Sequence, residues 1–367
     1  MLTRKILFLS PYPKDVAPSQ RLKFEQYFKS FEQAGYTIQT SSFISISFWK
    51  FVYQPKKYAQ KLVYTLIAYL KRFFVILTIR KYDIVYVHLW VTPFGPPIFE
   101  WFLHLMHPTI IYDIDDLVYL KENKSNSNKM ISFLKGRSKP IYLMKKAKHV
   151  ITCTPHLDQF VRKYNLNTTD ISSTINTDSY KVVNSYTSEH KIVLGWSGSH
   201  STSKYLYLIE DVLKELNSTH PFKLIVIGDA NFFINGLDIE AMEWSEEIEI
   251  STLQRFDIGL YPLPNEEWVL GKSGLKALQY MALGLPVIAT AIGANYRVIS
   301  DKETGFLVQT KEEWLNALTL LIESSDVRRS FGEKGRLKVE KNYSIRATAP
   351  IYLDILNNLI LLKKNIQ

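Results

Sequence analysis

The stretch that decides the fold is Lys272-Ser-Gly-Leu-Lys-Ala-Leu-Gln-Tyr-Met-Ala-Leu-Gly-Leu-Pro-Val-Ile-Ala-Thr290. It predicts a short helix from about Ser273 to Leu283, followed by a buried strand over 287–289. Gly284 suits the left-handed turn that ends a helix, and Pro286 then introduces the strand because it cannot continue the helix. A short helix that runs directly into an apolar strand is typical of α/β folds.

The start of this helix is a favourable place for an anion. Ser273 can cap the first turn, whose N–H groups have no partner within the helix. Lys272 and Lys276 add positive charge beside the positive end of the helix dipole, and such a terminus binds phosphates and carboxylates. The alternative interpretation is an ordinary helix on a sheet, with both lysines solvated.

Strands and helices alternate in both halves of the chain. The first half opens with a strand over 5–10, a helix over 19–34 and a strand over 36–41, which together make a right-handed βαβ unit. The alternation restarts with a strand over 192–198. Because 367 residues exceed what one core usually supports, we predict two α/β domains.

We place the domain boundary in a polar segment near residue 188. The first domain is predicted over 1–188 and the second over 189–344. The last stretch, 345–367, is predicted to be a helix that packs back on the first domain and is kinked or restarted at Pro350.

Two sets of polar residues are expected at the carboxyl edges of the sheets, where open α/β folds bind ligands. In the second half, the Gly/Ser turn with Gly198 and Ser199 would let a phosphate approach backbone amides, and Lys204 follows in the next helix. This turn matches neither the P-loop nor the Rossmann glycine pattern.

In the first half, the loop over 14–21 and the end of the strand over 82–90 should meet at one edge. His88 near this strand end is either a substrate contact or a hydrogen-bonded structural residue. Asp113 and Asp115 end another strand and could hold a divalent ion. Hydrogen bonding to loop amides is the favoured interpretation, because no histidine or further acidic cluster lies nearby in the sequence.

The charge is unevenly distributed. Up to residue 190 there are 26 Lys and Arg against 13 Asp and Glu, whereas from residue 191 there are 19 against 22. Residues 48–82 combine aromatic and aliphatic side chains with cations and contain no acid, which favours contact with an anionic membrane surface. Its cations include Lys56, Lys57, Lys71 and Arg72, and the last two interrupt the apolar run, so a spanning helix is not expected. A buried helix with solvated cations is the alternative.

Three further features bound the function. The single cysteine, Cys153, excludes an internal disulfide framework and suits a reducing compartment. The apolar run at Ile6–Leu9 is too short for a signal peptide, so a cytoplasmic location is expected. Nucleic-acid binding is not expected, because the basic half carries no recognition motif. A basic helix is predicted over 129–148.

These motifs together resemble the GT-B glycosyltransferases of retaining family four, the glycosyltransferase group 1. The resemblance extends over essentially the whole chain and is strongest in the second half. It rests on Asp83-Ile-Val-Tyr-Val-His88, Ile175-Asn-Thr-Asp178, Gly195-Trp-Ser-Gly198 with Thr202 and Lys204, Ile227-Gly-Asp229, Asp257-Ile-Gly259, Gln279-Tyr-Met-Ala-Leu-Gly-Leu-Pro-Val-Ile-Ala289, Gly305-Phe-Leu-Val308 and Asn342-Tyr-Ser344.

The resemblance implies two Rossmann-like domains that face a cleft, with a nucleotide sugar held by the second domain and the acceptor by the first. Lys204 falls at the family's phosphate-contacting lysine, but Ser199 stands where an arginine is usual. The family's two glutamates correspond to Gly271 and Gln279. Lys272 or Lys276 could replace the arginine, and Glu266 or Glu267 could reach the sugar.

The candidate residues fall into three groups. Catalytic roles are predicted for His88, Lys204 and Lys276. Donor binding is predicted for Gly198, Ser199, Glu267, Lys272, Ser273, Gly274 and Gln279. Acceptor-side roles are predicted for Ser19 and Arg21, and no residue is predicted to bind a metal.

We therefore expect a metal-independent transfer of a sugar, with retention, from a UDP- or GDP-linked donor to a lipid-linked or growing surface polysaccharide. The enzyme would attach peripherally to the inner face of the cell membrane through residues 48–82, and no cofactor besides the donor is expected. Two alternatives remain open: a soluble or protein acceptor, and a GT-B binding protein that has lost catalysis.

Overall fold

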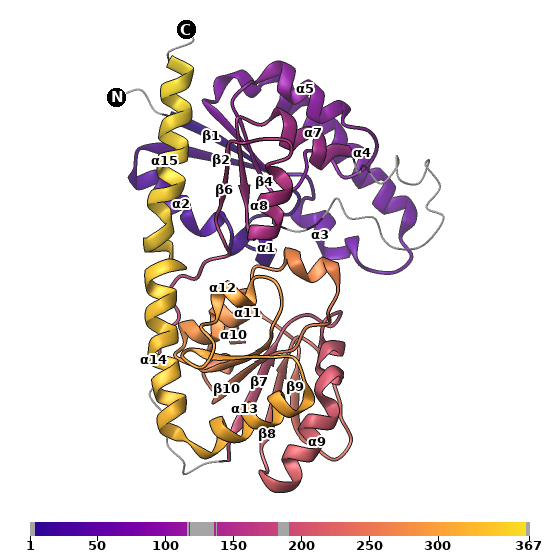
Figure 1. Cartoon of the computed structure of the whole chain (residues 1–367). Helices are drawn as coiled ribbons and strands as arrows, with labels where there is room; N and C mark the ends of the chain where they lie inside the picture. The colour runs from indigo at the N-terminus through magenta and orange to yellow at the C-terminus, as the bar shows by residue number, and fades with distance from the viewer. Residues whose placement is uncertain (1–3, 116, 118–135, 137, 183–190, 365–367) are drawn as a thin grey trace. The chain divides into compact units, whose positions relative to one another are not determined.

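The computed structural model describes residues 4–115, 117, 136, 138–182 and 191–364. The chain divides into two compact units, Met1–Ser172 with Thr348–Gln367, and Ser173–Ala347 (Figure 1). Each unit contains one six-stranded parallel sheet with helices on its faces. The predicted doubly wound α/β fold is therefore confirmed for both halves of the chain.

The sheet of the first unit has the order β2-β1-β3-β4-β5-β6. Its central strand β3 is buried at every position, as expected for a parallel strand covered on both faces. The strands are β1 (Arg4–Ser10), β2 (Tyr36–Ser42), β3 (Ile84–His88), β4 (Ile110–Asp113), β5 (His149–Thr152) and β6 (Thr168–Asp170). The helical segments are α1 (Pro18–Arg21), η1 (Glu25–Tyr27), α2 (Phe28–Gln33), α3 (Ile46–Val52), α4 (Tyr58–Leu77), η2 (Ile79–Lys81), α5 (Ile98–Met106), α7 (Ser138–Lys146), α8 (Pro155–Val161) and α15 (Ile345–Lys364).

The single helix predicted over 19–34 is wrong, because the segment is divided into α1, η1 and α2. Two inward-facing polar side chains accompany the break. Gln20 exchanges hydrogen bonds with the backbone N–H and C=O of Tyr12, at 2.8 and 3.0 Å. Lys23 is buried, and its ammonium donates to the carbonyl oxygens of Thr152 and Ile171. These tertiary hydrogen bonds outweigh the local helical preference.

Two cations expected at the surface are buried in the first unit. Arg72 in α4 is 1% exposed, and its guanidinium donates to the carbonyl oxygens of Ser10 and Ser41, at the carboxyl ends of β1 and β2. Arg72 therefore does not belong to a membrane-facing surface. Lys139 in α7 is also 1% exposed and contacts Glu100 at 3.3 Å. The rest of the helix predicted over 129–148 lies partly outside the described residues.

The sheet of the second unit has the order β12-β11-β10-β7-β8-β9. Alternate residues of β8 face opposite layers: Leu224 and Val226 pack with α9 and α13, and Ile225 and Ile227 pack with α11. The strands are β7 (Val193–Ser197), β8 (Lys223–Ile227), β9 (Asp238–Met242), β10 (Ile258–Tyr261), β11 (Val287–Thr290) and β12 (Gly305–Val308). The helical segments are η3 (Ser203–Ile209), α9 (Glu210–Thr219), α10 (Glu246–Leu253), η4 (Glu267–Gly271), α11 (Leu275–Ala282), α12 (Asn295–Val298), α13 (Lys311–Glu323) and α14 (Ser325–Asn342).

The second unit begins earlier in the sequence than the predicted boundary at 188. Ile175 pairs with Ser344 in a parallel bridge, and Ile175 and Tyr180 are buried in the core that contains α11. The polar composition of this segment suggested a linker, but its apolar side chains complete the second core. Residues 183–190 lie outside the described residues.

The last helix, α15, continues through Pro350 without interruption and lies mostly in the first unit from Thr348 onward. Its window Ile345–Leu362 is long and apolar enough to cross a membrane, but 39% of it is buried. The ring of Tyr352 packs 4.6 Å from that of Tyr27, within the first unit. The buried part of this window therefore supplies side chains to the core.

We expect Lys139→Met to lower the free energy of unfolding by roughly 3–5 kcal/mol, because it leaves the buried Glu100 carboxylate without its counter-charge. Glu100→Gln combined with Lys139→Met should recover much of that loss, since no isolated charge remains. Urea unfolding followed by circular dichroism measures both changes. A double variant as unstable as the single one would show that the charge pair is not the cause.

Candidate functional site

The start of α11 lies at the carboxyl edge of the second unit's sheet and has no side-chain cap. Its N-cap residue is Gly274, not the predicted Ser273, and its φ of +79° lies in the left-handed region. A Cβ at this position would lie 3.0 Å from the Cγ2 atom of Val298. Ser273 instead bonds through its hydroxyl to Ser173 at 2.7 Å. The first-turn N–H groups of α11 are therefore left for another acceptor.

Lys276 lies in this first turn, inside an aromatic cage formed by Trp196 and Tyr261. Its ammonium is 4.4 Å from the ring centroid of Trp196 and 5.4 Å from that of Tyr261. Within the described residues, the structure gives Lys276 no acidic partner. Burial and, to a smaller degree, the nearby Lys272 lower the pKa of Lys276 to about 7. A cation–π contact compensates for part of the lost hydration, but not for a missing counter-ion.

Gly198 brings the backbone close to this cation. It follows β7, and its N–H donates to the carbonyl oxygen of Ile227 at 2.9 Å. A Cβ at this position would lie 2.3 Å from the Trp196 ring and 2.8 Å from the ammonium of Lys276. Only glycine fits there without displacing the cage. The Gly/Ser turn and the start of α11, predicted separately, therefore meet at one point.

Two further predicted lysines lie on a second aromatic pair. The rings of Tyr205 and Trp268 stack at 5.6 Å. The ammonium of Lys204 lies 5.4 Å from the Tyr205 centroid, and that of Lys272 lies 5.6 Å from the Trp268 centroid. Lys204 is exposed. It belongs to the 3₁₀ segment η3 rather than to the predicted α-helix.

The loop between β7 and η3 is ordered by its own side chains. The N–H of Ser199 donates to the hydroxyl of Thr202 at 3.1 Å. The hydroxyl of Ser203 donates to Asp229 at 2.5 Å, and His200 contacts the other carboxylate oxygen of Asp229 at 3.0 Å. The Ser203 hydrogen bond is the main reason why the pKa of Asp229 is lowered. This carboxylate fixes the loop beside the Gly198 backbone.

Two residues that were predicted to bind the donor, Gln279 and Glu267, lie in unlike surroundings, one in the core and one at the surface. Gln279 is 4% exposed, and its amide nitrogen donates to the hydroxyl of Tyr180 at 2.8 Å and to Glu249 at 3.1 Å. It is therefore part of the core of the second unit. Glu267 is exposed at the start of η4, while its neighbour Glu266 accepts a hydrogen bond from the indole of Trp268 at 2.5 Å.

In the first unit, His88 belongs to a buried cluster of charged side chains with Asp113 and Lys23. It pairs in register with Asp113 across β3 and β4, and its Nδ1 atom lies 3.1 Å from the Asp113 carboxylate. Lys23 reaches the other carboxylate oxygen at 3.6 Å. Burial opposes a charge on His88, but the hydrogen bond to Asp113 and the charges of Asp115 and Asp113 outweigh it and raise its pKa. Burial opposes ionisation of Asp113, but Lys23 and His88 lower its pKa.

The Nε2 atom of His88 is buried without a hydrogen-bond partner in the described part of the chain. The Asp113 carboxylate contacts the side chains of Lys23 and His88 rather than the loop amides that the sequence favoured. Among the described residues, no group of three His, Cys, Asp or Glu side chains could hold a metal. The predicted acceptor-side residues Ser19 and Arg21 both lie in the short helix α1, which follows the loop after β1, and both are partly buried.

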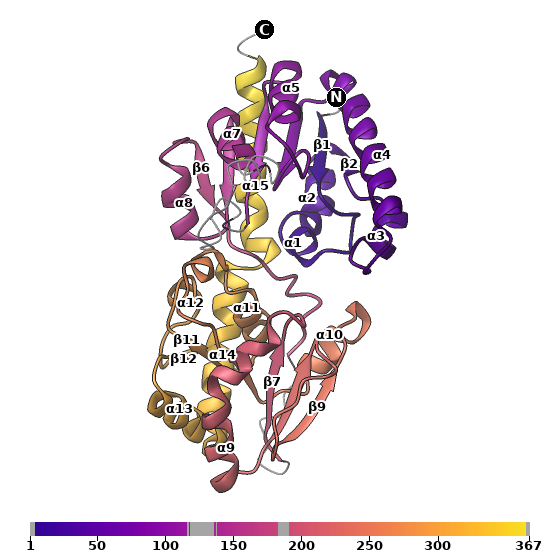
Figure 2. The ribbon, with the colours of Figure 1, turned by 90° about the vertical axis from the view of Figure 1, so that its right-hand side faces the viewer.

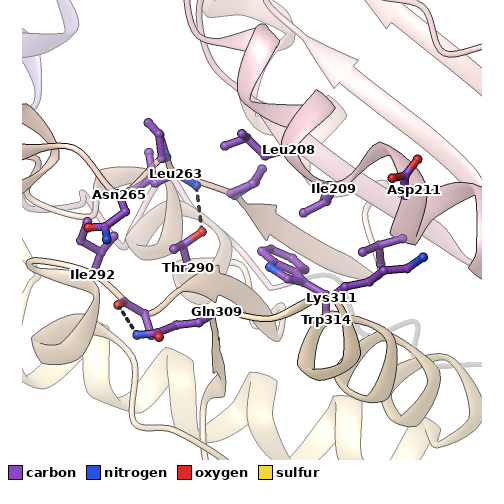
Figure 3. A pocket seen from close by; sticks show the side chains of 14 residues that line it. Leu208, Ile209, Asp211, Leu263, Asn265, Thr290, Ile292, Gln309, Lys311 and Trp314 are labelled. Atoms are coloured by element: carbon purple, nitrogen blue, oxygen red, sulfur yellow. Dashed lines mark hydrogen bonds between the residues drawn. The ribbon is translucent and has the colours of Figure 1, made fainter.

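A separate cavity of about 510 Å³ lies in the second unit, at the carboxyl ends of β10, β11 and β12 (Figure 3). Trp314, Leu208 and Ile209 form apolar walls, and Gln309 and Asn265 add amides. The hydroxyl of Thr290 accepts a hydrogen bond from the N–H of Leu263 at 2.9 Å. No sequence motif predicted this cavity, because its walls come from α9, α13 and three strand ends that are distant in sequence.

Comparison with known proteins identifies relatives of the second unit. Residues 191–324 match the family model described as glycosyl transferases group 1. The chain is 38% identical over 86 residues to a trehalose synthase of Pyrococcus horikoshii, covering 23% of this chain and 21% of that protein. The chain spans about a fifth of the length of this relative.

Solved structures resemble the whole chain in fold. Sucrose-phosphate synthase from Thermosynechococcus elongatus superimposes with a TM-score of 0.73 at 16% identity, over 98% of this chain and 100% of that one. Anabaena HepE in complex with UDP-glucose superimposes with a TM-score of 0.68 at 14% identity, over 96% and 99%. The two-sheet architecture is therefore that of the GT-B glycosyltransferases.

The lowered pKa of Lys276 predicts a pH dependence of stability. The folded value is about 7, whereas the ordinary value of lysine is 10.5. Between these values the unfolded chain binds a proton that the folded chain has released, so the free energy of unfolding rises with pH in this window. We expect Lys276→Met to lack this rise. Urea unfolding between about pH 7 and 10 measures it, and parallel curves for the two proteins would contradict the assignment.

Proposed function

Residues 191–324 belong to the group 1 glycosyl transferases, and we propose that the chain transfers a sugar from a nucleoside-diphosphate sugar to a glycan or lipid-linked acceptor. The observation that carries the proposal is the unpaired ammonium of Lys276 at the uncapped start of α11, beside the backbone of Gly198. This arrangement has the chemistry of a diphosphate site.

The proposed mechanism stabilises the leaving diphosphate. As the bond between the sugar and the phosphate breaks, negative charge accumulates on the phosphate oxygens. N–H groups of the first turn of α11 donate hydrogen bonds to these oxygens, and Lys276 supplies the positive charge. Because an adjacent anion favours the charged form of lysine, the diphosphate raises the pKa of Lys276 from about 7. Lys204 and Lys272 contact the remaining phosphate oxygens from the Tyr205–Trp268 pair.

The other predicted residues receive narrower roles. Gln279 holds α11 against Tyr180 and does not bind the ribose. His88 acts on the sugar side of the reaction through its Nε2 atom, while Asp113 holds its Nδ1 atom and the imidazolium form. This role of His88, and retention of the anomeric configuration, stay predictions that come from the family resemblance.

The proposal also covers the nucleotide of the donor, the acceptor and the place in the cell where the enzyme works. UDP is the favoured nucleotide, because the structurally similar HepE was crystallised with UDP-glucose. A lipid-linked or growing surface polysaccharide is the favoured acceptor, because residues 48–82 combine cations and apolar side chains without an acid. The enzyme then works at the cytoplasmic face of an anionic membrane. A soluble acceptor is the second candidate, favoured by relatives named for trehalose and D-inositol 3-phosphate.

We expect Lys276→Ala and Lys204→Ala each to lower the turnover of the donor by roughly 10²–10³-fold, as does removal of one donor from an oxyanion hole. Lys334→Ala, which removes an exposed lysine from α14, is the matched control. Release of nucleotide from a panel of UDP- and GDP-sugars measures turnover, and calorimetry with UDP and GDP measures binding. Wild-type rates in both site variants would remove the diphosphate assignment. Tight binding without turnover on any acceptor would favour a binding protein.

We also expect turnover to persist in EDTA, because lysines and helix N–H groups neutralise the diphosphate in this mechanism. Turnover with and without the chelator is compared at equal ionic strength. Loss of activity that Mg²⁺ or Mn²⁺ restores would contradict this expectation and would return Asp115 to consideration as a ligand.

A further inference from the structure

The exposed faces of α4 and α5 are apolar. Along α4 the solvent-exposed side chains include Leu62, Val63, Leu66, Ile67, Leu70, Phe73, Phe74 and Leu77. From residue 62 to residue 77 only one exposed side chain, Lys71, is charged. A helix on a soluble domain normally turns such a face toward the core and shows polar residues to water. In α4 the apolar side chains also cover the exposed face, while the buried side carries Ala68, Arg72 and Ile76.

Helix α5 continues the same surface. Its exposed residues are Ile98, Trp101 and Leu105, spaced by three and four positions, so they lie on one face. The two helices contact each other, because the rings of Phe73 and Phe102 stack at 5.8 Å. Figure 2 shows α4 along the outer edge of the first unit. The apolar side chains of both helices therefore form one continuous surface, called here the α4–α5 face. Single exposed leucines are common on soluble proteins, but a continuous apolar surface of this kind is not.

The charges around this face are almost all positive. Between residues 46 and 82 there are eight cations and no acid, and all of the cations except Arg72 lie at or near the surface. The single acid of α5, Glu100, is buried against Lys139. Tyr53, Tyr58 and Trp101 are exposed as well, and such amphipathic rings favour the boundary between headgroups and hydrocarbon. Apolar side chains surrounded by cations and aromatic rings match an anionic lipid surface.

We infer that the first unit inserts the α4–α5 face into the outer hydrocarbon of an anionic bilayer, so that attachment depends on apolar insertion and not only on charge. The inference rests on the proposed function in one respect: a lipid-linked acceptor is the reason why a transferase would attach to a membrane in this way. A second copy of the chain is a poorer occupant, because a symmetric pair would bring two cationic rims together. α4 lies parallel to the membrane plane in this arrangement rather than crossing it, which agrees with Arg72 anchoring it to the sheet.

The test is sedimentation with vesicles of equal parts phosphatidylcholine and phosphatidylglycerol. We expect the wild-type protein to bind, and the pair Leu66→Ser and Leu70→Ser to bind at least tenfold more weakly, because each substitution removes an apolar side chain that inserts into the bilayer. The matched control is Leu337→Ser, at a leucine of α14 in the second unit that is 64% exposed. It should bind as the wild type does. Trp101→Ser, a substitution on α5, should also weaken binding.

Salt separates insertion from adhesion by charge. Raising the salt concentration should weaken wild-type binding only in part, whereas Lys56→Gln with Lys71→Gln should remove the salt-sensitive part alone. Binding that salt abolishes completely, or leucine variants that bind like the wild type, would overturn the inference. Dimers in light scattering that the leucine variants abolish, without vesicle binding by the wild type, would also overturn it and assign the face to a second copy.

Failure of this inference is distinguishable from failure of the proposed function. The leucine variants should release nucleotide from a UDP-sugar in solution at the wild-type rate, because the α4–α5 face lies in the first unit and the diphosphate site in the second. Vesicle binding without sugar transfer would retain the inference and remove the function. Transfer without vesicle binding would do the reverse.

Discussion

A positive charge that has no acidic partner among the described residues is the constraint on which the site of the second unit depends. Lys276 is held by two aromatic rings, and the neighbouring Lys272 repels it. Folding gains little from such an arrangement, because partial burial of an ammonium weakens its hydration and no carboxylate compensates. Two neighbouring features also favour an anion. Helix α11 starts without a side-chain cap, and Gly198 has no side chain that would block a ligand from reaching Lys276. Each feature alone has a structural explanation, but their coincidence supports the anionic ligand proposed above.

In the first unit, by contrast, the buried cations Lys23 and His88 do have an acidic partner. At the carboxyl edge of this unit's sheet, the buried carboxylate of Asp113 pairs with both Lys23 and His88. The parallel register places His88 directly beside Asp113, so the pairing follows from the sheet rather than from a flexible loop. Within the described residues, the Nε2 atom of His88 has no hydrogen-bond partner. A fixed imidazole with one remaining nitrogen suits the positioning of a substrate, whereas the incomplete charges of the second unit suit its capture.

Local sequence patterns predicted most of the architecture and only part of the sites. The apolar runs of β1, β3 and β11 and the glycine at 284 were sufficient, because burial on both faces and left-handed turns leave direct marks in the sequence. The lysines at 204, 272 and 276 could be selected from helix starts. The cage of Trp196 could not be predicted, because it lies 80 positions from Lys276 and only the sheet order brings them together. The donor-binding role of Gln279 came from alignment with a family motif, whereas its amide donates to the hydroxyl of Tyr180 in the core.

The first unit also shows why charge patterns mislead when they are considered without the fold. Arg72 and Lys139 belong to basic segments, yet both are buried, one on the carbonyl ends of β1 and β2 and the other against Glu100. The leucines of the same helix as Arg72 are exposed. These two observations are linked: the guanidinium of Arg72 binds the carboxyl ends of β1 and β2, and this holds the side of α4 with Ala68, Arg72 and Ile76 against the sheet. Because α4 is apolar over most of its surface, the leucines on its other side then face outward. Water is a poor surrounding for an apolar face of this size, and this supports the lipid surface proposed above as its partner.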